Sequence, residues 1–186
     1  AFRHAHPDIA LGLEVGNTRT SLRLAAEGMV DLAVVGEAVA DELEIELRPL
    51  CEDRLSVVVA PGHRWARAGA VSAQELAAEP LILREEGSNT RQVLTRRLAA
   101  QGLKPQVAME LGATEAVKEA VAAGLGASVL SGWAVRHDLA SGRMVRVTVA
   151  NLDLSRTLHV AVGPGGLSAL GEAFVSHLRE QCPGVD

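Results

Sequence analysis

Apolar residues change their spacing within residues 112–131, and the change predicts a helix followed by a buried strand. Thr114 stands where an N-cap is expected, and Gly124 stands where a glycine can end the helix in a left-handed conformation. The mostly apolar run 127–130 then predicts a strand covered on both faces, with Ser131 as the next N-cap. The apolar residues that share one face of the predicted helix are Ala116, Val117, Ala120 and Val121.

The first part of the chain shows similar patterns in the order strand, helix, strand. Apolar residues alternate over 9–15, which predicts a strand with one apolar face. A helix is expected from Asn17 to Glu27, and the run 31–35 predicts a second, buried strand. Such units place their strands parallel through a right-handed crossover, with ligands at the carboxyl ends of the strands. We therefore expect a parallel βαβ unit with Asn17 and Thr18 on its ligand side.

The later elements predict a second α/β set and a connection between the two sets. One open sheet built from every predicted strand would be large for a chain of 186 residues. The apolar strands 54–60 and 157–162 lie far apart in sequence, with a complete α/β set between them. The predicted fold class is α/β, with residues 1–56 and 161–186 in lobe I, residues 57–160 in lobe II, and two crossing strands between the lobes. The other strands are expected at 43–50, 81–83, 107–111 and 144–149, and further helices are expected to start at Ser72, at Ser88–Thr90 and at Ser168.

Composition and charge narrow the classes of partner. Hydrophobic residues make up 48% of the chain and charged residues 22%, which is typical of a packed globular protein. The longest apolar run, 121–130, is about half as long as a membrane span, so no membrane partner is expected. The net charge of -5, with Lys and Arg scattered, leaves no electrostatic footprint for nucleic acid. An aromatic content of 2% argues against stacking of bases or sugars, and small polar or anionic ligands remain.

The residues best suited to chemistry form no recognised catalytic or metal-binding motif. Cys51 and Cys182 follow no C-x-x-C spacing, so two free thiols in a reducing compartment and one disulfide both stay open. The histidines lack metal-ligand spacing. No G-x-S-x-G turn occurs, and Gly124 and Gly126 follow a helix and precede a strand, the reverse of a dinucleotide motif. We therefore expect no metal, no cofactor and no catalysis.

Residues spread through nearly the whole chain match a known pattern in their order and spacing. They are Phe2 with His6-Pro7-Asp8, Glu14-Val15-Gly16, Gly28 with 30–34, 55–61 with His63, Pro80-Leu81-Ile82, Gly87-Ser88 with Thr90-Arg91, Glu115-Ala116-Val117-Lys118, Val121 with 123–126, and Leu130-Ser131. Together they resemble the effector-binding, or regulatory, domain of LysR-type bacterial transcriptional regulators. The resemblance implies two Rossmann-like lobes similar to a type II periplasmic binding protein, with a small effector in the cleft between the lobes.

The resemblance also implies partners and segments outside this sequence. In the family a winged helix-turn-helix and a linker helix precede this domain, and the first strand and first ligand loop are expected just before Ala1. DNA would be bound only through the N-terminal winged helix-turn-helix, and not by this chain alone. A homodimer, a tetramer of the full-length protein and a cytoplasmic location are further implications.

Carried over by position, the resemblance places candidate effector-binding residues at helix starts. Backbone N–H groups and small polar side chains at helix N-termini suit an organic acid or an inorganic oxyanion. Arg84 and Arg91 could add bidentate contacts, whereas Glu85 and Glu86 oppose an anion unless they point away. Ser and Thr at such positions are also ordinary N-caps, and that interpretation stays open. The candidates are Asn17, Thr18, Gly87, Ser88, Asn89, Thr90, Thr114, Leu130 and Ser131.

The leading hypothesis for function is a ligand-sensing domain of a transcriptional regulator. A bound metabolite would change the angle between the lobes and thereby the DNA-binding segments attached to them. The alternative is a periplasmic-type solute-binding protein for transport, which an upstream secretion signal would support and an upstream winged helix-turn-helix would exclude. A third hypothesis, a small α/β enzyme, predicts turnover of a bound metabolite.

Overall fold

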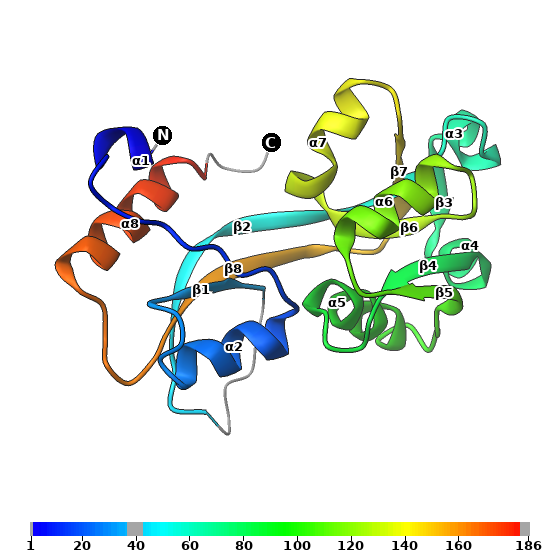
Figure 1. Ribbon diagram of the computed structural model, residues 1–186. Helices are drawn as coiled ribbons and strands as arrows, with labels where there is room; N and C mark the ends of the chain where they lie inside the picture. Colours follow the sequence, from blue (N-terminus) through cyan, green and yellow to red (C-terminus); the bar gives the residue numbers. More distant parts are fainter. Residues whose placement is uncertain (1, 37–42, 183–186) are drawn as a thin grey trace. The chain divides into compact units, whose positions relative to one another are not determined.

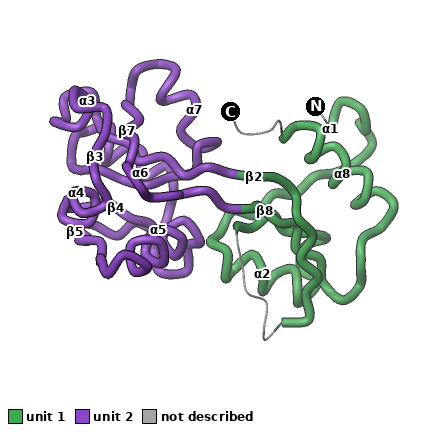
Figure 2. Tube along the Cα trace, turned by 180° about the vertical axis from the view of Figure 1, so that it is seen from behind, with its two compact units in different colours: residues 1–52, 157–186 green, residues 53–156 purple. Residues whose placement is uncertain are grey.

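Two compact units make up the chain. The computed structural model describes residues 2–36 and 43–182. Unit 1 combines residues 1–52 with 157–186, and unit 2 is the continuous segment 53–156 (Figure 2). The lobe boundaries predicted after residues 56 and 160 stay a prediction, and the compact units change over after residues 52 and 156.

Two strands carry the chain between the units, as the predicted α/β fold requires. β2 (Glu46–Val59) runs from unit 1 into unit 2, and β8 (Ser155–Val162) returns (Figure 1). The two strands are neighbours in one sheet. β2 replaces the separate strands expected at 43–50 and 54–60. Its side chains are half-buried or exposed up to Glu52 and mostly buried from Asp53 onward. The polar residues in the middle of β2 therefore do not interrupt the strand; they lie where it passes from exposed to buried surroundings.

Unit 1 is built around a short antiparallel strand pair. β1 pairs antiparallel with β8, and Leu22 and Ala25 of α2 pack against that pair. The rings of Phe2 and Phe174, on α1 and α8, meet edge to face with centroids 4.9 Å apart. The elements of unit 1 besides the two crossing strands are α1 (Phe2–Ala5), α2 (Thr18–Ala26), β1 (Ala33–Val35) and α8 (Ala169–Glu180).

Residues 9–15 do not form the strand that their alternation predicts. Leu13 and Val15 are 88% and 89% exposed. In the part of the chain that the structure describes, no strand pairs with this segment, and a strand needs a neighbour for its backbone N–H and C=O groups. The predicted parallel βαβ unit is therefore wrong. Its first strand does not form, and its second strand, β1, pairs antiparallel with β8.

Unit 2 combines two groups of strands with short helices. β2 pairs antiparallel with β6 and with β7, and β7 continues parallel to β3. β4 and β5 form a parallel pair. The strands are β3 (Ala70–Ser72), β4 (Pro80–Arg84), β5 (Gln106–Leu111), β6 (Ser128–Ser131) and β7 (Val145–Ala150), and the helices are α3 (Arg64–Ala68), α4 (Ala73–Ala78), α5 (Asn89–Ala99), α6 (Thr114–Ala122) and α7 (Gly132–Ala140).

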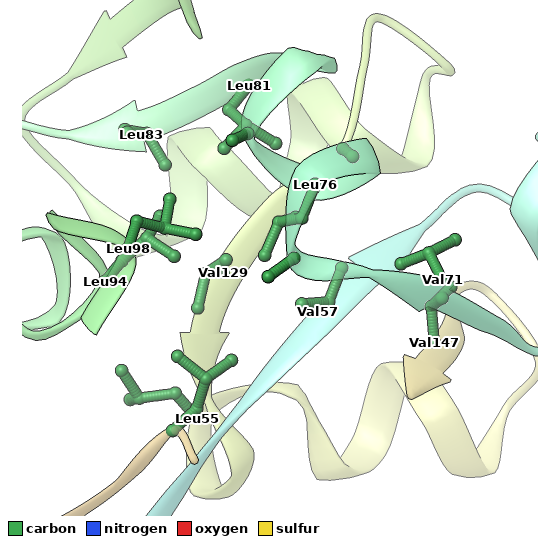
Figure 3. Close-up of a cluster of buried hydrophobic side chains, with 14 of the residues drawn as sticks. Leu55, Val57, Val71, Leu76, Leu81, Leu83, Leu94, Leu98, Val129 and Val147 are labelled. Atoms are coloured by element: carbon green, nitrogen blue, oxygen red, sulfur yellow. The ribbon is translucent and has the colours of Figure 1, made fainter. Parts of the chain in front are cut away.

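The main hydrophobic core of unit 2 anchors α5 against the strands. Figure 3 shows Leu94 and Leu98 of α5 beside Leu83 of β4, with Leu76 of α4 in the same cluster. These four side chains are at most 1% exposed. Burying a leucine side chain stabilises the fold by about 1.5–3 kcal/mol, so this face holds α5 against β4.

Local signals set several helix ends as predicted. The Ser72 hydroxyl accepts from the Glu75 N–H at 3.1 Å, and the Glu75 carboxylate accepts from the Ser72 N–H at 2.8 Å, which confirms a capping box. The turn that closes α5 contains Gly102, whose φ is 71°, and the Leu103 N–H donates back into the last helical turn at 3.0 Å. Gly124, with φ of 79°, ends α6 in the same way.

Candidate functional site

Three parallel segments of unit 2 end at one edge, and a helix follows each. β4 is parallel to β5, and Ala127 extends β6 beside β4 through a parallel bridge with Leu81. The Ile82 N–H donates to the Ala127 carbonyl at 2.8 Å, and the Ser128 hydroxyl donates to the Ile82 carbonyl at 2.6 Å. Parallel strands share their carboxyl ends, so the first residues of α5, α6 and α7 lie along one edge. We call this the helix-start edge.

The first residues of α5 are largely buried. Gly87, Ser88 and Asn89 are buried, and Thr90 is half-buried. Ser88 occupies the N-cap position but makes no side-chain cap bond, and its N–H donates to the Glu85 carbonyl at 2.9 Å. Of these four residues, only Thr90 is therefore partly accessible to solvent.

A buried ion pair holds the start of α5 in place. Arg156 donates from Nε and Nη2 to Asp53 Oδ2 at 2.9 and 2.7 Å, and the two side chains are 8% and 0% exposed. Arg156 Nη1 also donates to Asn89 Oδ1 at 2.9 Å and to Thr90 Oγ1 at 3.2 Å. The pair thereby connects β2, β8 and α5.

Ser131 joins the same network from the end of β6. Its hydroxyl donates to Asp53 Oδ1 at 3.0 Å and makes no cap bond to α7. The structure thus gathers three predicted site residues, Asn89, Thr90 and Ser131, around one ion pair. Leu130 is 1% exposed and its side chain belongs to the hydrophobic core, so only its backbone is suited to a ligand.

Thr114 lies at the start of α6 with a different basic partner. Ala113 occupies the N-cap position and Thr114 is the first helical residue, so the predicted cap was wrong by one position. The Thr114 hydroxyl accepts from Arg84 Nη1 at 2.6 Å. Arg84 also donates from Nε and Nη2 to the Glu85 carboxylate at 2.8 and 2.9 Å, so Glu85 faces a cation.

Arg91, the other arginine proposed for ligand contact, also forms hydrogen bonds with neighbouring residues. It donates to the Glu110 carboxylate and to the Arg84 carbonyl, the latter at 3.2 Å. Glu86 Oε1 lies 3.8 Å from Arg91 Nη2. Because carboxylates offset both arginines, the attraction for an anion at the helix-start edge comes mainly from the N-termini of α5, α6 and α7.

The remaining two predicted site residues lie in unit 1. Asn17 Oδ1 accepts from the Thr20 N–H at 3.0 Å, which confirms Asn17 as the N-cap of α2. Thr18 is the first residue of that helix. A role for either residue in binding an effector stays a prediction.

Asp53 and Arg156 are not among the residues predicted from the sequence, because those candidates stand at helix starts. The sequence did hold a signal. Opposite charges stand immediately before the apolar runs of the two predicted crossing strands, 54–60 and 157–162. Because one run begins where the chain enters unit 2 and the other where it leaves, both charges lie at the crossing, and an ion pair could have been proposed.

Residues 2–36 and 43–182 show neither a metal cluster nor a membrane-spanning helix. Within these ranges no three His, Cys, Asp or Glu side chains are grouped so as to hold a metal ion. Over the same ranges no helix has both the length and the apolar character to cross a membrane. Cys51 and Cys182 are not joined by a disulfide.

Comparison with known proteins identifies both related sequences and related structures. Residues 1–183 match the family model described as the LysR substrate binding domain. The uncharacterized HTH-type transcriptional regulator YeiE of Escherichia coli is 39% identical over 157 residues, covering 84% of this chain and 53% of that protein. The HTH-type transcriptional activator CmpR of Synechocystis is 30% identical over 178 residues, covering 95% of this chain and 58% of that protein. The chain thus spans little more than half the length of these relatives.

A solved structure supports the fold assignment. The Synechocystis CcmR regulatory domain in complex with 2-PG superposes with a TM-score of 0.85 at 27% identity, covering 97% of this chain and 86% of that one. The predicted type II periplasmic-binding-protein-like fold is confirmed by this likeness together with the family match. The family match covers almost the whole chain and agrees with both relatives, and the chain therefore belongs to the LysR substrate-binding domain family.

Proposed function

We propose that this chain is the effector-sensing domain of a LysR-type transcriptional regulator. It binds a small anionic metabolite, an organic acid or an inorganic oxyanion, at the helix-start edge of unit 2. The single observation that carries the proposal is the position of Thr90, Thr114 and Ser131, each at or next to the N-terminus of a helix that follows one of three parallel segments.

The chemistry of the edge suits an anion. A helix N-terminus carries the equivalent of about half a positive charge and presents unpaired N–H donors. Thr90 and Ser131 are half-buried, so their hydroxyls lie near the surface while the adjoining Ser88 and Asn89 are packed inside. The complex of the related CcmR domain with 2-PG supports a small-molecule ligand for this chain too.

Regulation follows from differential binding. A ligand shifts a protein between conformations only by the difference in its affinity for them. In the whole protein, whose relatives are HTH-type regulators, that shift alters how attached DNA-binding segments meet DNA. The DNA contact lies outside this chain, and the regulatory assembly is a homodimer or, at full length, a tetramer.

The role proposed here is binding, without turnover. The transcriptional regulators among the relatives favour it over the solute-transport alternative. After incubation with the protein, a bound metabolite is expected to be recovered chemically unchanged, and mass spectrometry of the released ligand checks this. A changed product would indicate an enzyme.

A thermal-shift screen of organic acids and oxyanions tests the site. A ligand at a hundredfold excess over Kd stabilises the fold by about 2.7 kcal/mol. The double variant Thr90→Val with Ser131→Ala should weaken the ligand's affinity about fivefold or more, since at least the hydrogen bond from Thr90 is lost. Thr148→Val with Ser141→Ala makes the same chemical changes at exposed positions and should leave the affinity unchanged. Equal affinity in both double variants would contradict the site.

A further inference from the structure

The buried ion pair fixes the direction in which neighbouring hydroxyl groups can form hydrogen bonds. A guanidinium can only donate, and an ionised carboxylate can only accept. Arg156 and Asp53 are nearly inaccessible to solvent, and their groups are satisfied by each other and by Asn89, Thr90 and Ser131. Neither charged group is therefore a free ligand for an effector. Their effect on the site is indirect.

Arg156 determines what Thr90 can offer. The Thr90 oxygen accepts from Arg156 Nη1 at 3.2 Å, so its own proton points elsewhere. At the start of α5 that proton adds a hydrogen-bond donor to the backbone N–H groups. Thr114 resembles it, because its oxygen accepts from Arg84 at 2.6 Å. Both threonines are set to donate to an acceptor such as a carboxylate or phosphoryl oxygen.

Asp53 has the opposite effect on Ser131. The Ser131 proton is committed to Asp53 Oδ1 at 3.0 Å, and Asp53 cannot return a donor. The hydroxyl therefore presents lone pairs to a ligand. A fully ionised oxyanion, which has only acceptor atoms, is poorly matched to such a group, whereas an O–H or N–H donor matches it.

We infer that the Arg156–Asp53 pair makes the edge selective for a ligand with two different groups: an anionic oxygen for Thr90, and a hydroxyl or amino donor for Ser131. The inference rests on the proposed function and narrows it to hydroxylated or aminated acids. Asp53 and Arg156 act as positioning residues, because they set the polarity of groups that would touch the ligand.

Matched pairs of acids test the selectivity. Glycolate is compared with acetate, and malate with succinate, by amide chemical-shift titration, which measures weak binding. In the natural sequence the hydroxylated member of each pair is expected to bind about fivefold more tightly, the value of one hydrogen bond. Ser131→Ala should bring the two members within about twofold of each other, and Ser141→Ala should leave the preference intact.

A second variant tests whether Asp53 sets the direction of the Ser131 hydrogen bond or only supports the fold. Asp53→Asn can supply an amide donor to Ser131, which releases the serine proton and lowers the preference for the hydroxylated acids. The measured quantity is the ratio of two affinities, which a uniform loss of folded protein does not change. Circular dichroism confirms folding of each variant, and Ser131→Ala decides the matter if Asp53→Asn does not fold.

The outcomes distinguish this inference from the proposed function. Binding of all four acids at the helix-start edge without a preference, or a preference that survives Ser131→Ala, would overturn the inference and leave the proposed function standing. Absence of binding by any of the acids, and by sulfate and phosphate, would count against both.

Discussion

Acidic side chains of unit 2 are buried where a basic partner meets them. Asp53 is paired with Arg156, and Asp138 has a side chain 7% exposed whose Oδ2 lies 2.9 Å from Lys118 Nζ. Removing a charge from water costs several kcal/mol, so each acid depends on its partner. Arg143 adds a second contact to Asp138 at 3.2 Å. Two stability predictions follow from these pairs.

Breaking the Asp53 pair should be costly. Asp53→Leu leaves the Arg156 guanidinium buried without its counter-ion and is expected to lower the free energy of unfolding by about 3–5 kcal/mol. The double variant Asp53→Leu with Arg156→Met removes the stranded charge and should recover part of that loss. Urea unfolding monitored by circular dichroism measures both. Arg48→Met, at ion pairs with the exposed Glu46 and Glu172, is the control and should change the midpoint much less.

Acid should weaken the contact between α6 and α7. Burial alone would raise the pKa of the Asp138 carboxyl, but the hydrogen bond and charge of Lys118, with help from Arg143, hold that pKa below its usual value. A carboxyl whose pKa is lower in the folded state stabilises the fold above its unfolded pKa of about 4 and loses that contribution as the pH falls through its folded pKa. Asp138→Asn should therefore flatten the fall in stability below about pH 4.

Urea titrations between neutral and acidic pH measure this slope. The exposed Asp31 provides a control, because Asp31→Asn removes a carboxylate without breaking a buried pair. A slope in Asp138→Asn equal to that of the natural sequence would refute the assignment. Lys118 behaves in the opposite sense, because its hydrogen bond to Asp138 raises its pKa, so its contribution is lost only in strong alkali.

A close approach between backbones constrains how near α2 lies to the end of β8. Gly163 follows β8, and a Cβ atom built there would collide with the Ala25 carbonyl oxygen near the end of α2. Backbone atoms cannot swing aside as a flexible side chain can. The glycine therefore sets the distance between α2 and β8 within unit 1.

Substitution at this contact should separate the two elements. Gly163→Ala is expected to lower the free energy of unfolding by about 1–3 kcal/mol or more, because the clash must be relieved by moving backbone. Gly165→Ala, two residues further along, meets nothing within 4 Å and should change stability by less than about 0.5 kcal/mol. Thermal unfolding of the two variants compares them directly. Similar melting temperatures would show that the helix can shift without cost.

The two units differ in how many segments of the chain build them. Unit 2 is one continuous segment, whereas unit 1 needs both ends of the chain. The two hydrophobic clusters that contain Leu94 and Val117 draw their residues from within 53–156. Arg156 and Asp53, at the two ends of this segment, are held together by their ion pair.

Unit 2 should therefore fold as an isolated fragment. A protein comprising residues 53–156 is expected to unfold cooperatively in urea, with a single sigmoidal transition. Introducing Leu94→Ala into the fragment should lower its stability by about 2–5 kcal/mol, since that side chain is 0% exposed. Leu125→Ala, at a residue 60% exposed, is the control. A fragment without a cooperative transition would mean that unit 2 depends on unit 1.

Local structure and the class of fold could be predicted from the residue pattern alone. Ser72 with Glu75 forms the predicted capping box, and Gly102 ends α5, because both signals act within a few residues. The continuous apolar runs at β4 and β6 predicted buried strands, because such runs are typical of strands covered on both faces. The ordered pattern of residues also sufficed to predict the family.

Features that depend on residues far apart in the sequence could not be predicted in this way. The alternating segment 9–15 lacks a paired strand, and alternation alone supplies no hydrogen-bond partner. Asp53 and Arg156 are 103 residues apart, and only pairing of β2 with β8 brings them together under Thr90 and Ser131. The sequence named those two hydroxyls as candidates for the site. The buried ion pair determines which of them can donate and which can accept, because hydrogen-bond direction is set by the partner and not by the residue itself.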